Sequence, residues 1–210
     1  MRTRLGVMHI RLILAVALAA AAAPAVAQDA GGMRVWRSIA TNDDRRRLHD
    51  WRDAFVEALA EARAGGFGAE IARESTLLRP DAALARPAIP NGRYRCRTLK
   101  LGNRGGAGLA FVGYRAFDCS VDTGRFGQVF TKTGGSQRPS GRLFPGDDRK
   151  LIFLGTMLLG DETRAMRYGI DPGRDMAGAV ERIGPRKWRL ILPYPRFEST
   201  LDVVELIPAS

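Results

Sequence analysis

The sequence changes character at Pro90, and this change limits the available folds more than any other feature. Before Pro90, apolar residues recur at helical spacing; after it, short apolar or alternating runs are separated by Gly, Asn, Asp and Pro. Eight strands are expected there, at 92–101, 109–121, 126–133, 141–144, 150–159, 176–183, 187–192 and 201–207. No helical pattern between them is long enough for repeated crossovers between parallel strands. The sequence therefore predicts an antiparallel meander.

Closing such a meander into a barrel removes its exposed edges. We therefore expect a mainly β, α+β protein in which an N-terminal helical segment packs on an antiparallel barrel. The barrel is expected over residues 91–210, with roughly eight strands and a lipocalin-like form. A β-sandwich of the same strands is the alternative. An eight-stranded barrel has an interior that is either just filled by side chains or able to hold one small ligand.

Residues 41–90 carry the helical segment and a proline-rich linker. Thr41 is a suitable N-cap, and Gly65-Gly66 ends the helical pattern that follows it. A shorter helical piece is expected at 69–74. The apolar stripe of the main helix consists of Leu48, Trp51, Phe55, Ala58, Leu59 and Ala62. The linker contains Pro80, Pro87 and Pro90.

Residues 1–27 have the parts of a secretory signal peptide. A basic start precedes an apolar run at 12–23, which is shorter than the ~20 residues of a membrane-spanning helix. A small-x-small cleavage sequence then ends at Ala27, and Gln28 stands where a lipoprotein has Cys. We therefore expect a periplasmic or secreted protein, with no transmembrane segment after cleavage and a flexible leader over 28–40.

Charge and cysteine content narrow the classes of partner. The chain has 33 Lys and Arg against 22 Asp and Glu, but the basic residues are spread along it without a dense block. Together with the expected export, this argues against a nucleic-acid partner. The two cysteines, Cys96 and Cys119, predict a disulfide in an oxidising compartment. They lack metal-ligand spacing, and His49 is the only histidine after the signal, so no metal is expected.

Several segments after Pro90 resemble the family called domain of unknown function 4893, a group of secreted alphaproteobacterial proteins. The segments that carry this resemblance are Gly92–Arg97, Lys100–Gly102, Gly135–Arg138, Phe153–Gly155, Arg182–Gly184 with Trp188–Leu190, and Phe197–Pro208. The resemblance covers nearly all of the chain after the signal, including the helix with Trp51. It implies no catalytic residues, because the family has no established activity. In architecture alone, the chain is also similar to lipocalin-type and bacterial protease-inhibitor barrels.

One loop-like segment, residues 132–141, has the composition of a ligand-binding loop. Its glycines let backbone amides approach a ligand, while Lys132, Gln137 and Arg138 are able to hold a carboxylate or phosphate. The alternative is a hairpin in which Gln137 and Arg138 bind backbone carbonyls or Glu198.

Aromatic residues form a second candidate site at the mouth of the expected barrel. Tyr94, Phe111, Tyr114 and Trp188 are placed to line an apolar cavity there. The alternative is that these side chains simply fill the core.

These observations favour a non-enzymatic envelope protein that binds a small apolar or anionic ligand, or a protein partner, without a cofactor. The first alternative is a periplasmic protease inhibitor that presents its N-terminal segment, residues 28–40, to a protease. The second is a hydrolase that uses Lys132 and Ser136, which lie four positions apart.

Overall fold

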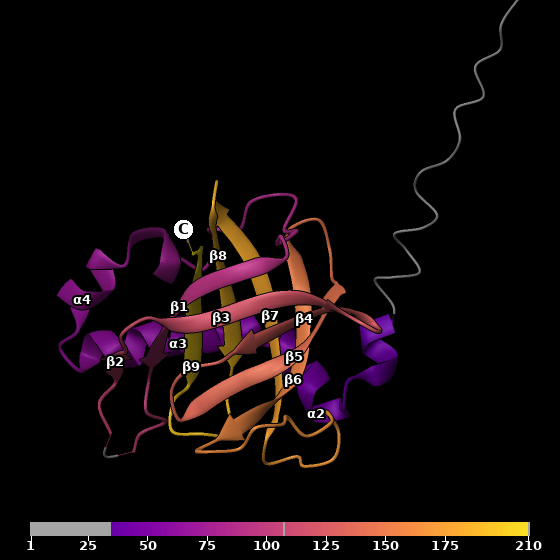
Figure 1. Ribbon diagram of the computed structural model, residues 1–210. Helices are drawn as coiled ribbons and strands as arrows, with labels where there is room; N and C mark the ends of the chain where they lie inside the picture. The colour runs from indigo at the N-terminus through magenta and orange to yellow at the C-terminus, as the bar shows by residue number, and fades with distance from the viewer. Residues whose placement is uncertain (1–34, 107, 210) are drawn as a thin grey trace, which may run out of the picture.

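The barrel is a single antiparallel sheet that closes on itself. The computed structural model describes residues 35–106 and 108–209. In this part of the chain the strand order is β2-β1-β3-β4-β5-β6-β7-β8-β9, and β1 also pairs with β9 (Figure 1). The strands are β1 (Gly92–Leu101), β2 (Phe111–Gly113), β3 (Phe117–Gly124), β4 (Gly127–Lys132), β5 (Gln137–Pro145), β6 (Lys150–Leu159), β7 (Asp175–Gly184), β8 (Lys187–Pro193) and β9 (Leu201–Pro208). The predicted antiparallel barrel is confirmed, rather than the sandwich.

Strands β2 and β3 together occupy one position in the barrel. Cys96 of β1 pairs with Phe117 of β3, whereas Leu99 pairs with Gly113 of β2, so both strands lie along the same edge of β1. The predicted strand 109–121 is therefore interrupted at residues 114–116 by a bulge-like break. The barrel has eight positions, and the ninth strand is the result of this break.

Strand β5 is longer than the sequence indicated. The segment 137–140, expected to be part of a loop, pairs with β6, and Pro139 stands opposite Met157. Pro-Ser-Gly is typical of a turn, but here the register with β6 overrides this local preference. Gly141 and Gly155 face each other in the same pair of strands, and a Cβ on Gly155 would come within 2.7 Å of the Gly141 Cα.

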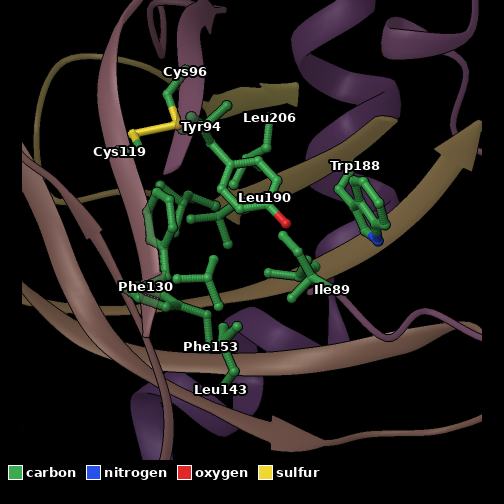
Figure 2. Close-up of a cluster of buried hydrophobic side chains, with 14 of the residues drawn as sticks. Ile89, Tyr94, Cys96, Cys119, Phe130, Leu143, Phe153, Trp188, Leu190 and Leu206 are labelled. Atoms are coloured by element: carbon green, nitrogen blue, oxygen red, sulfur yellow. A yellow bond between two sulfur atoms is a disulfide. The ribbon is translucent and has the colours of Figure 1, made fainter. Parts of the chain in front are cut away.

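The barrel interior is apolar over most of its length because the side chains alternate along each strand. Tyr94 and Cys96 of β1 face inward, as do Leu190 of β8 and Leu206 of β9 (Figure 2). The rings of Phe130 and Phe153 pack edge to face, with centroids 6.0 Å apart. The predicted disulfide is present between Cys96 and Cys119, across the β1–β3 pair.

The helical segment covers part of the outer wall of the barrel. It comprises an α-helical stretch at residues 35–39, α2 (Asn42–His49), α3 (Trp51–Ala64), α4 (Gly68–Arg73) and the 3-10 helix η1 (Ser75–Leu78). The one helix expected after Thr41 is divided at Asp50, and Thr41 caps α2 by accepting a bond from the Asp44 amide. Figure 1 shows α3 behind the barrel, with α4 and α2 on opposite sides.

The inner face of α3 supplies a second core, between the helices and strands β1, β8 and β9. Its buried residues include Phe55 and Leu59 of α3 against Leu99, Ile191 and Val203 of the strands. These strand residues alternate with those inside the barrel, so both faces of β8 and β9 are buried. Each such aliphatic side chain contributes about 1.5–3 kcal/mol when it leaves water.

A buried arginine fastens the end of the helical segment to this wall. Arg189 of β8 is fully buried and donates two hydrogen bonds to Glu181 of β7, at 2.9 and 2.7 Å. It also donates to carbonyl oxygens at the end of η1 and beyond, those of Leu77, Arg79 and Pro80. The guanidinium thus joins two layers, and its loss would leave Glu181 buried without a partner.

The proline-rich linker closes one end of the barrel. Ile89 inserts into the interior beside Tyr94 and Trp188, as Figure 2 shows. The Tyr94 hydroxyl donates to the carbonyl of Pro90 at 2.7 Å, and the Trp188 indole donates to the carbonyl of Ala88 at 3.2 Å. The segment expected to be a linker is therefore the plug of the barrel; we use "plug" below for residues 84–91.

The predicted signal peptide, residues 1–27, and the first part of the predicted leader lie outside the described residues. From residue 35 onward the leader region is helical, and Trp36 and Ala40 are buried against strands β5 to β7. Residues 35–40 are thus part of the packed fold. No helix in residues 35–106 or 108–209 has the length and hydropathy needed to cross a membrane.

Candidate functional site

The end of the barrel opposite the plug contains a cavity of about 310 Å³. It lies where β1 and β9 approach the loops that precede β3, β5 and β9. Its lining consists of Thr98, Lys100, Tyr114, Phe117, Lys132, Gly135, Ser136, Gln137 and Glu198. A second hollow, under the loop 102–109, shares Lys100, Tyr114 and Glu198 with it. We call the first space the open-end cavity.

Strand alternation brings polar side chains to this end. Tyr94 and Cys96 face inward in the apolar half of the barrel, and the same face of β1 continues with Thr98 and Lys100. On β4, Phe130 lies in the apolar interior, and Lys132 lies two residues further toward the opening. The interior therefore changes from apolar at the plug to basic at the open end.

Lys132 is a buried cation that has no acidic partner in the part of the chain that the structure describes. Its residue is only 5% exposed, and among the described residues no carboxylate oxygen lies within 4.0 Å of its Nζ. The Nζ donates instead to the carbonyls of Gly134 and Gln137, at 2.6 and 2.9 Å, and lies 4.4 Å from the centre of the Phe117 ring. Burial, aided by the nearby Arg138 charge, lowers the pKa of Lys132 to about 8.

Lys100 has two acidic neighbours of different kinds. Its Nζ lies 3.2 Å from Oε2 of Glu198 and 4.0 Å from Oδ2 of Asp202. Asp202 comes from the inward face of β9, is buried, and accepts a hydrogen bond from the Ser199 hydroxyl. Burial raises the pKa of Asp202 to about 6, although Lys100 and the Ser199 hydrogen bond act in the opposite direction. Glu198 belongs to the loop before β9, and its side chain is 71% exposed.

The remaining walls of the cavity are aromatic or neutral. Tyr114 lies at the β2–β3 break and is partly exposed, and Phe117 begins β3. Gln137 begins β5, and Ser136 precedes it in the loop. The arrangement provides two ammonium groups at the base and apolar ring surface at the side. Such a site suits an anion attached to a small apolar body.

Comparison with known families agrees with this architecture. The family model for a domain of unknown function (DUF4893) matches residues 36–206. The chain belongs to the DUF4893 family. The match spans both the helical segment and the barrel, as the resemblance noted in the sequence indicated. Searches of curated proteins and of solved structures found no match to this chain. The expected likeness to lipocalins therefore stays at the level of a prediction.

In this DUF4893 domain, three of the seven predicted ligand-binding residues meet in the open-end cavity. These are Lys132, Gln137 and Tyr114, which come from three separate segments. Ser136 lines the same cavity, so the two residues of the hydrolase hypothesis lie close together. However, Lys132 directs hydrogen bonds to the carbonyls of Gly134 and Gln137.

The other four predicted residues lie elsewhere. Tyr94 and Trp188 pack edge to face at the plugged end, with ring centroids 6.2 Å apart. Arg138 donates to the carbonyls of Gly135, Gly160 and Glu162 and so joins two loops, close to the alternative in which it caps a hairpin. Phe111 stacks on Phe67 outside the barrel. We do not include these four residues in the candidate site.

Lys100, Asp202 and Glu198 were not identified as a cluster from the sequence. The alternation that places Tyr94, Cys96 and Thr98 on one face also places Lys100 there, so the sequence carried a usable signal for Lys100. Asp202 likewise lies on the same face of its strand as Val204 and Leu206, two and four residues further along. Their meeting depends on the pairing of β1 with β9, which local patterns do not encode. In the described part of the chain, no group of His, Cys, Asp and Glu has the arrangement of a metal site.

Proposed function

We propose that this protein is a non-enzymatic envelope protein that binds a small anionic ligand with an apolar portion in the open-end cavity. The observation that carries the proposal is the Lys132 ammonium, which is buried, faces a cavity and has no acidic partner among the described residues. Burying an unpaired charge is costly, so folds retain one chiefly where an anion compensates it.

The chemistry of the cavity assigns a role to each wall. Lys132 and Lys100 supply charged donors for a carboxylate or a similar anion. The Gln137 amide and the Tyr114 hydroxyl are neutral hydrogen-bonding groups near the opening. Phe117, whose ring already contacts the Lys132 ammonium, provides apolar surface for the rest of the ligand. The plug occupies the far end, which favours entry and exit of a ligand through the open end.

Export to the periplasm or beyond is part of the proposal. Two features support it: the signal-like sequence of residues 1–27 and the disulfide between Cys96 and Cys119. Disulfides persist in oxidising compartments and are rare in the cytosol. Intact-mass measurement of the protein purified from its native envelope tests this, because cleavage after Ala27 and loss of two hydrogens each change the mass.

Benzoate titration tests the binding role, with benzamide as the neutral analogue of the same shape. We expect calorimetry to detect benzoate binding and to show benzamide binding at least 10-fold more weakly. Lys132→Met should weaken benzoate binding by about 10- to 100-fold, since hydrogen bonds to charged groups contribute about 1.5–3 kcal/mol. Lys150→Met removes the same charge at the plugged end and serves as the control. Equal binding of benzoate and benzamide, or no effect of Lys132→Met, would contradict the proposal.

The protease-inhibitor hypothesis placed residues 28–40 in a protease cleft. The second half of that segment, residues 35–40, packs on the barrel, with Trp36 only 8% exposed. No contact of the described residues favours this role over small-ligand binding, so we make a single proposal.

A further inference from the structure

The charges around the open-end cavity leave room for one more negative charge. Lys100 and Lys132 are buried cations, and Asp202 is the buried anion that the described part of the chain places beside Lys100. Asp202 is held in place by the Ser199 hydroxyl and lies on a regular strand, so it is a fixed part of the site. Arg138 also lies near Lys132, but it donates to three backbone carbonyls and is not among the residues that line the cavity. Among the buried charges of the lining and Asp202, two are positive and one is negative, which leaves a single positive charge to be compensated.

Glu198 supplies that compensation in the structure, but it is not a fixed part of the barrel. Its side chain is 71% exposed, and it reaches Lys100, whose side chain is 8% exposed, from the loop before β9. The pair thus joins a solvated carboxylate to a buried ammonium. Ion pairs with one partner in water are weak, because water competes for the exposed carboxylate.

The loop backbone is shaped to present Glu198 in this position. Glu198 has φ +58°, a left-handed conformation that is uncommon for a residue other than glycine, asparagine or aspartate. The Ser199 amide donates to the carbonyl of Phe197 at 2.7 Å, and the Tyr194 amide donates to the carbonyl of Thr200 at 2.9 Å, closing the loop on both sides. The carboxylate therefore lies at the cavity because the loop directs it there.

We propose that Glu198 is a displaceable internal carboxylate that covers Lys100 until the carboxylate of a ligand takes its place, so that the cavity selects small monocarboxylates. This inference rests on the proposed binding function and adds the ligand class and the mode of entry. When the Glu198 side chain turns into solvent, the bound monocarboxylate replaces its negative charge beside Lys100. A dianion would exceed that balance by one charge, and a neutral ligand would leave Lys100 uncovered.

The exchange predicts a specific consequence of removing the internal carboxylate. The Glu198 carboxylate is tethered to the loop, so it competes for Lys100 at an effective concentration in the millimolar range. A free carboxylate ligand must displace it in order to bind. Glu198→Gln keeps the size of the side chain but removes the negative charge. It should therefore tighten benzoate binding, by about 10-fold, while leaving the affinity for benzamide within a factor of about two.

The experiment compares benzoate, benzamide and phthalate, the corresponding dianion, by calorimetry on the wild type and two variants of the full mature protein. Asp161→Asn is the matched control, because Asp161 is an exposed acid on the loop that follows β6 at the same end of the barrel. Tighter benzoate binding in Glu198→Gln, with no change in Asp161→Asn and weaker phthalate than benzoate binding to the wild type, supports the inference.

Other outcomes overturn it in distinguishable ways. If the wild type binds benzoate and Glu198→Gln binds it equally or more weakly, the cavity is a binding site but Glu198 is no competitor. If both variants gain affinity equally, the effect is one of net charge alone. If neither the wild type nor Glu198→Gln binds benzoate, both the exchange and the proposed function fail.

Discussion

The two ends of this barrel treat buried polar groups in opposite ways. At the plugged end, Tyr94 and Trp188 each direct a donor to a backbone carbonyl of the plug. Arg182, which is partly exposed, also donates to the plug, to the carbonyls of Arg86 and Ala85 at 3.0 and 2.6 Å. At the open end, Lys132 is buried beside two carbonyls and a ring, and within residues 35–106 and 108–209 no carboxylate pairs with it. At the plugged end these side chains find their partners within the chain, and at the open end we propose that a ligand supplies the missing negative charge.

This difference separates the buried polar groups that stabilise the fold from those that are suited to binding a ligand. A buried donor that bonds to a carbonyl of its own chain replaces most of the hydrogen-bonding free energy that it lost on leaving water. A buried ammonium without a counter-charge does not regain its solvation free energy in this way, and this lowers the stability of the folded state. Destabilised positions of this kind are typical of functional sites. Removing a buried polar side chain should therefore lower the free energy of unfolding at the plugged end and leave it unchanged or raise it at the open end.

Trp188→Ala should produce the largest effect, at the plugged end. Truncating a buried Trp costs about 3–5 kcal/mol, and here the carbonyl of Ala88 also loses its donor. Chemical denaturation of the variant should show this loss, while benzoate binding measured under native conditions should stay within a factor of two. A similar loss of benzoate affinity would show that the two ends are not independent.

Replacing both Cys96 and Cys119 with Ala tests the middle of the barrel, between the two ends. The disulfide closes a loop with a sequence separation of 23. Its removal should lower the free energy of unfolding by about 3 kcal/mol through the greater entropy of the unfolded chain. The native cavity should be preserved, so benzoate affinity is expected to hold. Denaturation of the oxidised and reduced wild-type protein provides the matched comparison.

Lys132→Met should have the opposite sign from Trp188→Ala, with stability at pH 7 equal to the wild type or higher by up to about 2 kcal/mol. The pKa of Lys132 falls to about 8 on folding from an ordinary value of 10.5. Below pH 8 the folded protein therefore carries a proton that it holds less strongly than the unfolded chain does. This cost to the wild type fades as pH rises from 8 through 10.5. Denaturation at pH 7 and 9.5 should show the advantage of the variant shrinking; an advantage that grows with pH would contradict this.

The pH dependence of anion binding should give the smallest effect. Benzenesulfonate suits this test because it does not titrate in the range used. Asp202, with its pKa raised to about 6, loses its negative charge beside Lys100 as pH falls, so binding should tighten below pH 6. Lys132, with its pKa lowered to about 8, loses its positive charge as pH rises, so binding should weaken above pH 8. Calorimetry from pH 5 to 9.5 should show affinity falling in two steps, and an affinity that rises with pH would rule out this role for the lysines.

The sequence predicted much of the barrel, because alternation is a local signal. Strands 92–101 and 150–159 match the observed bounds, and the disulfide was predicted from parity and compartment. Local signals failed where long-range register decides. Pro139 lies in a strand because β6 holds its neighbours, and the strand 109–121 breaks to follow both halves of β1.

The sequence predicted only part of the candidate site, again because it carries local patterns but not long-range pairing. Lys132 and Gln137 were identified because they are near each other in a glycine-rich segment. Lys100 and Glu198 lie 98 residues apart and meet only when β1 and β9 close the barrel. The plug was missed because prolines indicate a linker, and nothing in their spacing shows that the linker crosses the end of a barrel.

The pairing of the first strand with the last also constrains when the protein can fold. The β1–β9 ladder joins residues at least 100 positions apart, and the hydrogen bond between Arg97 and Glu205 spans 108. Contacts this distant are slow to form, since a long loop must be ordered before they stabilise anything. The helices and the plug come first in the chain, yet their docking surfaces on β7, β8 and β9 come last. A chain that crosses a membrane from its N-terminus would thus stay open until its final strand arrives, and the barrel would close in one late step.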